Sequence, residues 1–483
     1  MATSPASTSP GNNQLDRSPA ARAAETEKSA NLMPSQGNQQ KRVLGLCSAT
    51  STVICNMIGA GIFMTTGLFA AELGSGTAIM AVWLVAGVLA LCGSLCAIEL
   101  ANIWPEAGGN YVFIRNIFGR PAGFVAGFSI AFFGITGSMA IIGGIFGFYL
   151  HGLFPSISEP VAASLAIVTV TAIHAMGARE GNALTVTGAF FKISLLLAFI
   201  IFGFSSESTA VSAPASTLNS GDGVLFGTSA AALGAALAAT SFAYQGNMAT
   251  SFIGGEILNP EKNIKRSMLF GISIVTILYL LMNGVFLWAA APHEMVDADG
   301  KGVEDIGFFV ANRLFGESIG IAASVLIMLV FFSALSVAVL IGSRVIYSMG
   351  LRHELPRCTA LLNRKGSPVY ALLLQCGIGL ALIWATGLKD LLEAVGTLVT
   401  LTTGVAIAGV IVLRVRKPDL HRPVKLPFFP LPPIVFLSLT AWMTWGVLST
   451  NPTSIVLILG IIALGLVVWF GFAEKYSREI GSE

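Results

Sequence analysis

Apolar stretches of roughly 20 residues recur along almost the whole chain, separated by short polar or charged segments. That length matches the hydrocarbon core of a bilayer, about 30 Å thick, and most stretches lack the polar face of a soluble helix. The pattern predicts an all-α integral membrane protein with twelve transmembrane helices. We place the spans at 43–71, 77–103, 121–150, 161–178, 182–204, 226–252, 267–291, 318–349, 368–386, 391–414, 432–449 and 454–472.

Two of the predicted spans are interrupted near their middle. The first contains MIGAGIF, residues 57–63, and the sixth contains SFAYQGNMATSF, residues 241–252. Interrupted segments at matching places in two halves of a chain indicate an inverted-repeat transporter. We therefore expect one repeat at 42–204 and a second at 226–414, with the last two spans, 432–472, outside the repeats.

Composition agrees with this class, since 54% of the residues are hydrophobic and 11% are charged, against about 25% charged in soluble domains. Residues 1–41 are rich in Ser, Pro, Ala, Asn and Gln, which predicts a disordered tail, and residues 473–483 form a second tail. Of the 27 Lys and Arg, only Lys301, Arg313 and Lys389 fall on the side opposite the termini, while Lys192 lies within a span. The positive-inside rule then places both termini in the cytoplasm, with the chain in the inner or plasma membrane.

The two interruptions have complementary chemistry. At the first, the N–H groups at the start of a new half-helix can bind a carboxylate. At the second, the carbonyls of Phe242, Ala243 and Tyr244 can accept hydrogen bonds from an ammonium group. Two breaks that face each other would bind a zwitterion of the size of an α-amino acid. The alternative is that the glycines only allow close packing between helices.

Lys192 lies well inside the fifth span, where a charge costs about 2.5–3.5 kcal/mol on insertion scales. We expect its ammonium beside the break in the first span and near the hydroxyl of Ser333 or Ser336, where a sodium ion could otherwise bridge two helices. The alternative is a lysine held by carbonyls for packing alone.

Other polar positions have simpler interpretations. Glu99 and Glu256, at the ends of their spans, should pair with basic residues, and His174 should be a satisfied interface histidine. We expect an amphipathic helix at the membrane interface within 105–119, and a short helix on the opposite side near 303–315. No disulfide, metal site, cofactor or nucleic-acid partner is expected.

Competing function classes fit the sequence less well. A membrane enzyme needs clustered His, Asp or Glu on neighbouring spans, and the five histidines are scattered. A channel would not need paired helix breaks. No acidic residue lies in the middle of spans 1, 3, 6 or 8, so a cationic substrate side chain would lack a counter-charge. A neutral amino acid is the expected substrate.

Five motifs in order resemble those of the amino acid–polyamine–organocation (APC) superfamily, most closely its L-type amino acid transporter branch and bacterial relatives. They are IGAGIF, PEAGGNY, FAYQG, GEILNPEKNI and GSRVIYSMGLRHELP, and the resemblance covers about residues 42–472. It implies a fold of five plus five inverted helices and sodium-independent transport by alternating access.

The resemblance also implies roles for matching residues. The substrate carboxylate would bind the first break, and the ammonium would bind the carbonyls around Phe242, with the Phe242 ring as the outer gate. Lys192 would tie the fifth span to the first. The residues of the first break are Ile58, Gly59, Ala60 and Gly61.

Three positions depart from that family pattern. Ala60 stands where many members have serine, and Gln245 stands beside the pocket where L-type members commonly have glycine. The loop HGLFPSISEP, residues 151–160, lacks the cysteine that joins animal members to a heavy subunit. We therefore expect the chain to work without that partner, as an exchanger; the alternative is a proton-coupled symporter of an amino acid or amine.

Overall fold

The computed structural model describes residues 41–206, 230–296, 302–303, 305–316, 320–385, 388–450 and 453–476. All of them belong to one compact unit, Gln40–Glu483. The predicted disordered tail lies outside the described residues except for Lys41. At the other end, helical structure continues to Tyr476, so the first four residues of the predicted second tail are helical.

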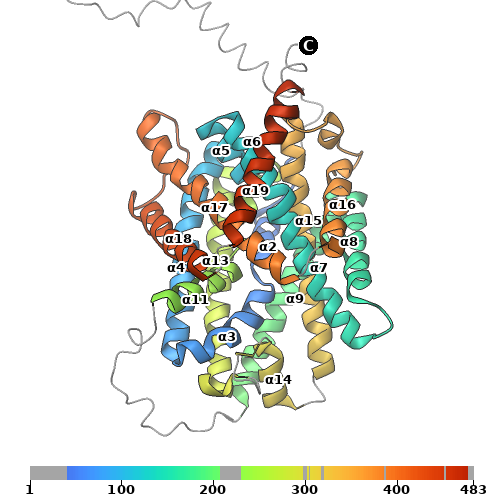
Figure 1. Ribbon diagram of the computed structural model, residues 1–483, viewed down its shortest axis with the longest axis vertical. Helices are drawn as coiled ribbons and strands as arrows, with labels where there is room; N and C mark the ends of the chain where they lie inside the picture. Colours follow the sequence, from blue (N-terminus) through green and yellow to red (C-terminus); the bar gives the residue numbers. More distant parts are fainter. Residues whose placement is uncertain are drawn as a thin grey trace, which may run out of the picture. The chain divides into compact units, whose positions relative to one another are not determined.

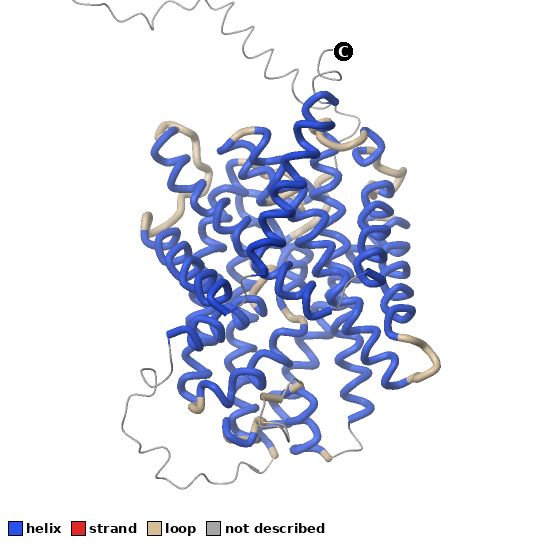
Figure 2. The backbone as a smooth tube through the Cα atoms, viewed as in Figure 1, coloured by secondary structure: helices blue, strands red, loops and turns tan. Residues whose placement is uncertain are grey.

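Apolar helices make up nearly all of the described chain, and no strand is present in the described ranges (Figure 1, Figure 2). The first half contains α2 (Leu46–Met57), α3 (Ala60–Leu73), α4 (Gly76–Ile103), α5 (Asn110–Phe118), α6 (Arg120–Phe128), the π-helix η2 (Ser129–Ile135), α7 (Thr136–Leu153), α8 (Glu159–Met176) and α9 (Ala178–Ser205). The second half contains α11 (Ala230–Ala243), α12 (Ala249–Phe252), α13 (Pro260–Ala289), α14 (Ile306–Phe315), α15 (Gly320–Leu351), α16 (Val369–Ala385) and α17 (Leu388–Arg416), followed by α18 (Leu431–Thr450), α19 (Thr453–Val468) and the π-helix η7 (Trp469–Ala473).

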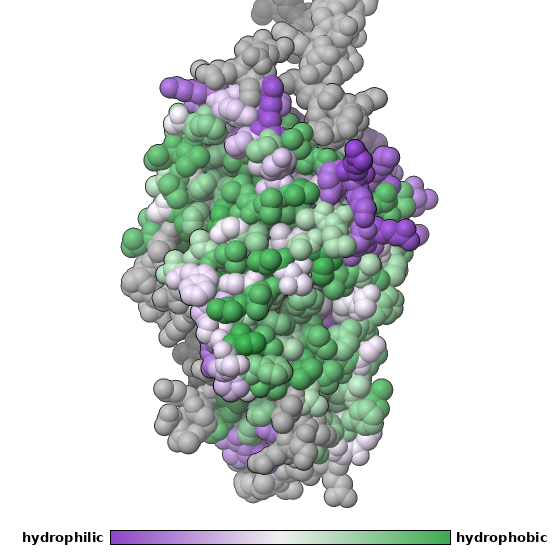
Figure 3. Space-filling view, turned by 90° about the vertical axis from the view of Figure 1, so that its right-hand side faces the viewer, coloured by the Kyte–Doolittle hydropathy of each residue, from purple (hydrophilic) through white to green (hydrophobic). Residues whose placement is uncertain are grey.

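The predicted membrane class is confirmed by helix length. Among the described residues, nine helices are long and apolar enough to cross a bilayer. Three shorter apolar helices, Leu233–Ala243, Val369–Ala385 and Leu431–Trp445, coincide with the remaining predicted spans. Apolar side chains cover the middle of the face drawn in Figure 3, and hydrophilic ones gather towards its upper part.

Both interruptions predicted from the sequence are present. The first span is divided into α2 and α3 by Ile58 and Gly59, and the sixth into α11 and α12 by the turns at 244–248. The order of elements also repeats: a divided helix, a long helix and a short helix (α5 or α14) precede three further helical segments in each half.

Both short helices expected from the sequence are present. The one near 303–315 is confirmed as α14, which begins at Ile306 because the carboxylate of Asp305 accepts a hydrogen bond from the backbone N–H of Phe308, at 2.9 Å. The helix expected within 105–119 is present as α5, which buries its first half and leaves Arg115 and Ile117 partly exposed. In α5, Tyr111 and Phe113 are at most 1% exposed, because the helix packs into the bundle against α6 and α17.

We name the two ends of the bundle by their residues. The arginine-rich face carries Arg42, Arg115, Arg344 and Arg414, and lies at the top of Figure 1 near the label C. The α14 face is the opposite end, where α3 and α14 lie together.

Candidate functional site

The break in the first span leaves an amide-rich helix start beside open space. Ile58 (φ −73°, ψ 101°) and Gly59 (φ −145°, ψ −146°) are non-helical, and α3 begins at Ala60. The N–H groups of a first helical turn have no partner within the helix and carry partial positive charge. A Cβ placed on Gly59 would meet no atom within 4 Å. A carboxylate therefore has room to approach the start of α3 at this glycine.

The other glycine of the motif is closely packed. A Cβ on Gly61 would lie 2.6 Å from the Cα of Ala243, at the end of α11. The two helix breaks therefore face each other through Gly61 and Ala243. Gly61 is explained by helix packing, the alternative weighed from the sequence, whereas Gly59 borders open space.

A second contact joins the same two breaks, and here the glycine belongs to the second break and its neighbour to the first. A Cβ on Gly246 would lie 2.7 Å from the Nδ2 atom of Asn56, and the φ of Gly246 is +108°, which strongly favours glycine. Asn56 and Gly246 are partly exposed, whereas Cys55, Met57 and Asn247 are buried. The amide of Asn56 is thus a polar group at the junction that the sequence interpretation did not include.

The three carbonyls expected to bind an ammonium group each accept one hydrogen bond in this structure. Those of Phe242 and Tyr244 accept from the N–H groups of Gln245 (3.0 Å) and Asn247 (3.3 Å). The carbonyl of Ala243 accepts from the hydroxyl of Tyr279, at 3.2 Å. Because a carbonyl oxygen has two lone pairs, each can accept one further hydrogen bond from a ligand.

Tyr279 on α13 contacts both breaks and was not identified from the sequence. Its hydroxyl also lies 2.7 Å from the carbonyl oxygen of Met57, the last residue of α2. The side chain is fully buried, and its ring makes edge contacts with the rings of Trp83 and Tyr244, with centroids 5.2 Å apart in each case. A buried tyrosine hydroxyl usually has a partner, so a tyrosine inside an apolar span was the available signal.

Lys192 on α9 lies at the break in the first span, where we expected it. Its Nζ atom donates to the carbonyls of Cys55, at 2.8 Å, and Ile58, at 2.5 Å, and the side chain is fully buried. Both carbonyls belong to the C-terminal end of α2, which carries partial negative charge. The ammonium therefore neutralises the end of one half-helix directly beside the start of the next.

The hydroxyls expected beside Lys192 have other partners. Ser333 donates to the carbonyl of Val330 within α15, at 2.8 Å. Ser336 lies 2.8 Å from Nε2 of His174 and 3.3 Å from the hydroxyl of Thr185. This arrangement confirms the interpretation of His174 as a satisfied interface residue.

Two further predicted residues lie at the end of α11. The ring of Phe242 is half-buried, and its Cδ2 atom would lie 3.9 Å from a Cβ placed on Gly396 in α17. The ring thus lies near α17, a helix of the same half of the chain. Gln245 is partly exposed in the turn that follows.

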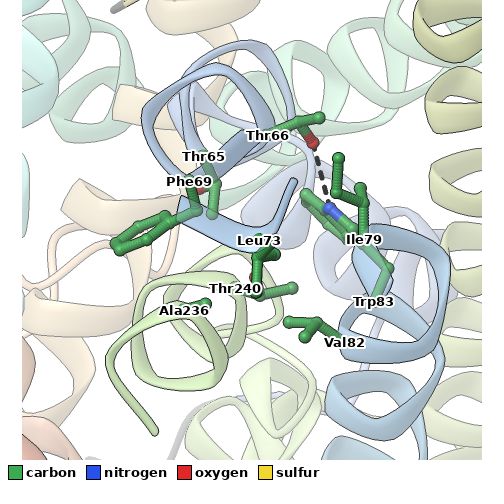
Figure 4. A pocket seen from close by; sticks show the side chains of 9 residues that line it. All are labelled: Thr65, Thr66, Phe69, Leu73, Ile79, Val82, Trp83, Ala236 and Thr240. Atoms are coloured by element: carbon green, nitrogen blue, oxygen red, sulfur yellow. Dashed lines mark hydrogen bonds between the residues drawn. The ribbon is translucent and has the colours of Figure 1, made fainter. Parts of the chain in front are cut away.

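A small cavity lies between α3, α4 and α11, towards the α14 face. It measures about 10 Å³, room for about one water molecule, and Trp83 donates across its rim to the hydroxyl of Thr66 at 3.0 Å (Figure 4). Its lining residues are Thr65, Thr66, Phe69, Leu73, Ile79, Val82, Trp83, Ala236 and Thr240. Because it is this small, it cannot hold an amino acid.

The arginine-rich face is closed over the breaks by backbone hydrogen bonds. The N–H groups of Val43 and Leu44 donate to the carbonyl of Glu256 at 2.8 and 2.9 Å, and the N–H of Leu258 donates to Leu44 at 2.9 Å. The N–H of Gly108 donates to Phe252 at 3.0 Å. The chain before α2, the chain after α12 and the segment before α5 therefore meet on this face.

The carboxylates expected to pair with basic residues do so on the same face. Glu256 binds Arg344 at 2.7 Å, with both side chains at most 3% exposed. Glu99 lies between Arg414 (2.5 Å) and Arg422 (3.3 Å). Both predicted pairings are confirmed.

Comparison with known proteins agrees with this geometry. The family model described as amino acid permease matches residues 44–464. The serine/threonine exchanger SteT of Bacillus subtilis is 28% identical over 92% of this chain and 99% of its own length. The large neutral amino acids transporter small subunit 2 of Homo sapiens is 27% identical over 89% of this chain and 80% of its own. The Asc-type amino acid transporter 1 of Mus musculus is 28% identical over 89% and 81%. With its divided helices and the match over most of its length, the chain belongs to the amino acid permease family of the APC superfamily.

Proposed function

We propose that this permease exchanges neutral amino acids across the membrane by alternating access, without sodium. One observation carries the proposal. Gly61 contacts Ala243, so the amide start of α3 and the carbonyl end of α11 converge beside the open space at Gly59. The N–H groups of residues 59–61 would bind the substrate carboxylate, and the carbonyls of Phe242, Ala243 and Tyr244 its ammonium group. Phe242 would close the site from the α14 face, and Gln245 would border the substrate side chain.

The charges near the site support a neutral substrate and sodium independence. Glu99, Glu256 and Glu354 are held by arginines on the arginine-rich face, so they do not offer a counter-charge to a cationic substrate. The ammonium of Lys192 already supplies positive charge at the break, where a sodium ion would otherwise be useful. Exchange is favoured because the relatives' names include a serine/threonine exchanger.

In this proposal the arginine-rich face is the cytoplasmic one, by the positive-inside rule. The segments 42–204 and 226–414 are the two inverted repeats, and opening towards the cytoplasm breaks the hydrogen bonds between Leu44 and residues 256–258. The short connection 154–158 between α7 and α8 contains no cysteine. The chain therefore acts without a disulfide-linked heavy subunit.

Radiolabelled amino acid counterflow into proteoliposomes tests the proposal. Uptake should require unlabelled amino acid inside the vesicles and should be unchanged when choline replaces sodium on both sides. Uptake into empty vesicles driven by an imposed pH gradient would instead establish proton-coupled symport, the alternative. A steep sodium dependence would contradict both.

A further inference from the structure

The loop between α17 and α18, residues 417–430, carries an unusual combination of exposed side chains. We call it the α17–α18 loop; Figure 1 shows it on the outside of the helix bundle. Lys417 and Lys425 are exposed, as is Arg416 at the end of α17. In the loop Phe428 is 82% exposed, and Val415, at the end of α17, is 75% exposed. Basic and apolar side chains thus share one surface segment.

Phe428 is unfavourable in two respects for a residue that contacts only water. Its ring is largely exposed, and its φ of +56° lies in the left-handed region, which bulky residues rarely adopt. Backbone strain of this kind persists where the surroundings enforce it and often marks a functional position. The exposure of this large aromatic ring is explained if the ring enters an apolar medium.

The loop conformation is fixed from within the bundle. The guanidinium of Arg422 donates to the carbonyls of Lys417 (2.9 Å) and Leu420 (2.8 Å) and pairs with Glu99 on α4. The carboxylate of Glu99 also accepts from the backbone N–H of Leu426, at 2.7 Å. The exposed side chains are therefore presented in a defined arrangement.

The apolar part of the segment continues onto the lipid-facing side of α18. Leu431 and Ile434, one helical turn apart, are 61% and 49% exposed. Together with Phe428 they form an apolar strip that leads from the loop towards the hydrocarbon core. The cations lie at the loop end of this strip, which is the arrangement of a surface that binds the headgroup layer of a membrane.

Charge selects among membrane lipids. Residues 414–425 include five basic residues: Arg414, Arg416, Lys417, Arg422 and Lys425. They are balanced by only two carboxylates, that of Asp419 in the same stretch and that of the buried Glu99 on α4. We propose that the α17–α18 loop is a binding surface for anionic phospholipids of the adjacent leaflet, with Phe428 inserted among the acyl chains and Arg416, Lys417 and Lys425 at the headgroups. A cation near an anionic surface contributes about fivefold to binding.

Binding is measured on the purified full chain in detergent. Short-chain phosphatidylglycerol is titrated, and its midpoint concentration is read from the rise in unfolding temperature. Arg416→Gln/Lys417→Gln/Lys425→Gln should raise that midpoint by at least tenfold. Phe428→Asn, which leaves the charges intact and tolerates positive φ, should raise it by about threefold or more. The matched control is Lys262→Gln/Lys265→Gln/Arg266→Gln, which removes three cations from the first turns of α13 on the same face.

Further measurements distinguish an anionic lipid from other ligands that carry a phosphate group. Phosphatidylcholine of equal chain length and inorganic phosphate should not stabilise the parent at the concentrations used. If the loop variant unfolds without lipid at a lower temperature than the parent, Lys425→Gln alone is used, with an expected rise of about fivefold. Any of three results overturns the proposal. They are a parent-like midpoint in the loop variants, a midpoint raised as much in the α13 control as in the loop variants, and equal stabilisation by phosphatidylcholine.

Discussion

The hydroxyl of Tyr279 lies 2.7 Å from the carbonyl oxygen of Met57, and the same hydroxyl lies 3.2 Å from the carbonyl of Ala243. One side chain on α13 therefore contacts both helix breaks. Because the end of α2 and the end of α11 share this partner, a movement of one break changes the hydrogen bonding of the other.

Tyr279→Phe tests this connection. The ring packing against Trp83 and Tyr244 is kept, while two buried carbonyls lose a donor, at a cost of about 1–3 kcal/mol. We expect counterflow to slow by roughly tenfold or more, with the chain still folded, since about 1.4 kcal/mol is a factor of ten in rate. Tyr370→Phe, at a half-exposed position on α16, is the control and should exchange like the parent. Parent-like exchange by Tyr279→Phe would show that the shared hydroxyl is dispensable.

The two glycines of the first break should respond differently to the same substitution. Gly61→Ala places a methyl group against Ala243, so it should lower the unfolding temperature and exchange together. Gly59→Ala meets no protein atom, so it should fold like the parent but bind amino acid more weakly, because the methyl group occupies the ligand's space. Unfolding temperature and substrate affinity of both variants decide the matter. Unchanged affinity in Gly59→Ala would place the carboxylate elsewhere.

A compensating variant strengthens that comparison. In Gly61→Ala/Ala243→Gly the Cβ of residue 243 is removed, while its Cα remains 2.6 Å from the added methyl position. We expect partial recovery of the unfolding temperature relative to Gly61→Ala alone. No recovery would mean that the clash at Gly61 lies with another neighbour.

The features predicted well from the sequence are those with a local signal. Span positions follow from the length of apolar stretches, and the helix breaks follow from glycines within two of them. Lys192 was identifiable because a charge deep in an apolar span needs a partner. The carbonyls of the interrupted helix were the obvious partner, and the structure contains that contact.

Contacts between helices were harder to predict, because they depend on how each helix is rotated about its axis. Ser333 and Ser336 are both on α15, yet one donates within its own helix and the other faces His174. Tyr279 and Asn56 reach the site from positions whose sequence surroundings do not indicate which neighbour they meet. The burial of α5 likewise depends on α17, which is almost 300 residues away in the chain.

Asp305, at the start of α14, should give stability a pH dependence. Burial raises the pKa of its carboxyl group, an effect opposed by hydrogen bonds from the Tyr149 hydroxyl and from backbone N–H groups. A raised pKa in the folded state means that the neutral form is favoured, so stability is lost as pH rises through it. Asp305→Asn should therefore gain in unfolding temperature over the parent as pH rises above the ordinary titration range of an aspartate. A difference independent of pH would contradict this assignment.

The Glu256–Arg344 pair should hold the arginine-rich face closed. Glu256→Gln leaves a buried arginine without its counter-charge, which typically costs about 3–5 kcal/mol. We expect α2 to separate more often from the chain after α12, exposing Cys55, which is buried against the carbonyl of Ser333. The measurement is the rate of maleimide labelling of Cys55 in a background whose other cysteines are serine. Lys365→Gln, which breaks a surface pair with Glu180, should leave the rate unchanged.

Lys192 provides the last test, because its ammonium holds the carbonyls of Cys55 and Ile58 on the two sides of Met57. Lys192→Ala removes both hydrogen bonds and the charge at the end of α2, so the half-helix loses its tie to α9. We expect counterflow to fall at least tenfold. Substrate affinity should weaken more on one side of the membrane than on the other, because the contacts of Lys192 stabilise the two transport states, open to one side or to the other, to different extents. Lys192→Met, which keeps most of the side-chain volume, separates loss of charge from loss of packing and should be as slow as Lys192→Ala.

Each protein is measured with and without sodium and with and without an imposed pH gradient. If Lys192→Ala exchanges at the parent rate, the tie has no role in transport, and if the gradient alone drives uphill uptake by the parent, the lysine belongs to a proton-coupled cycle instead.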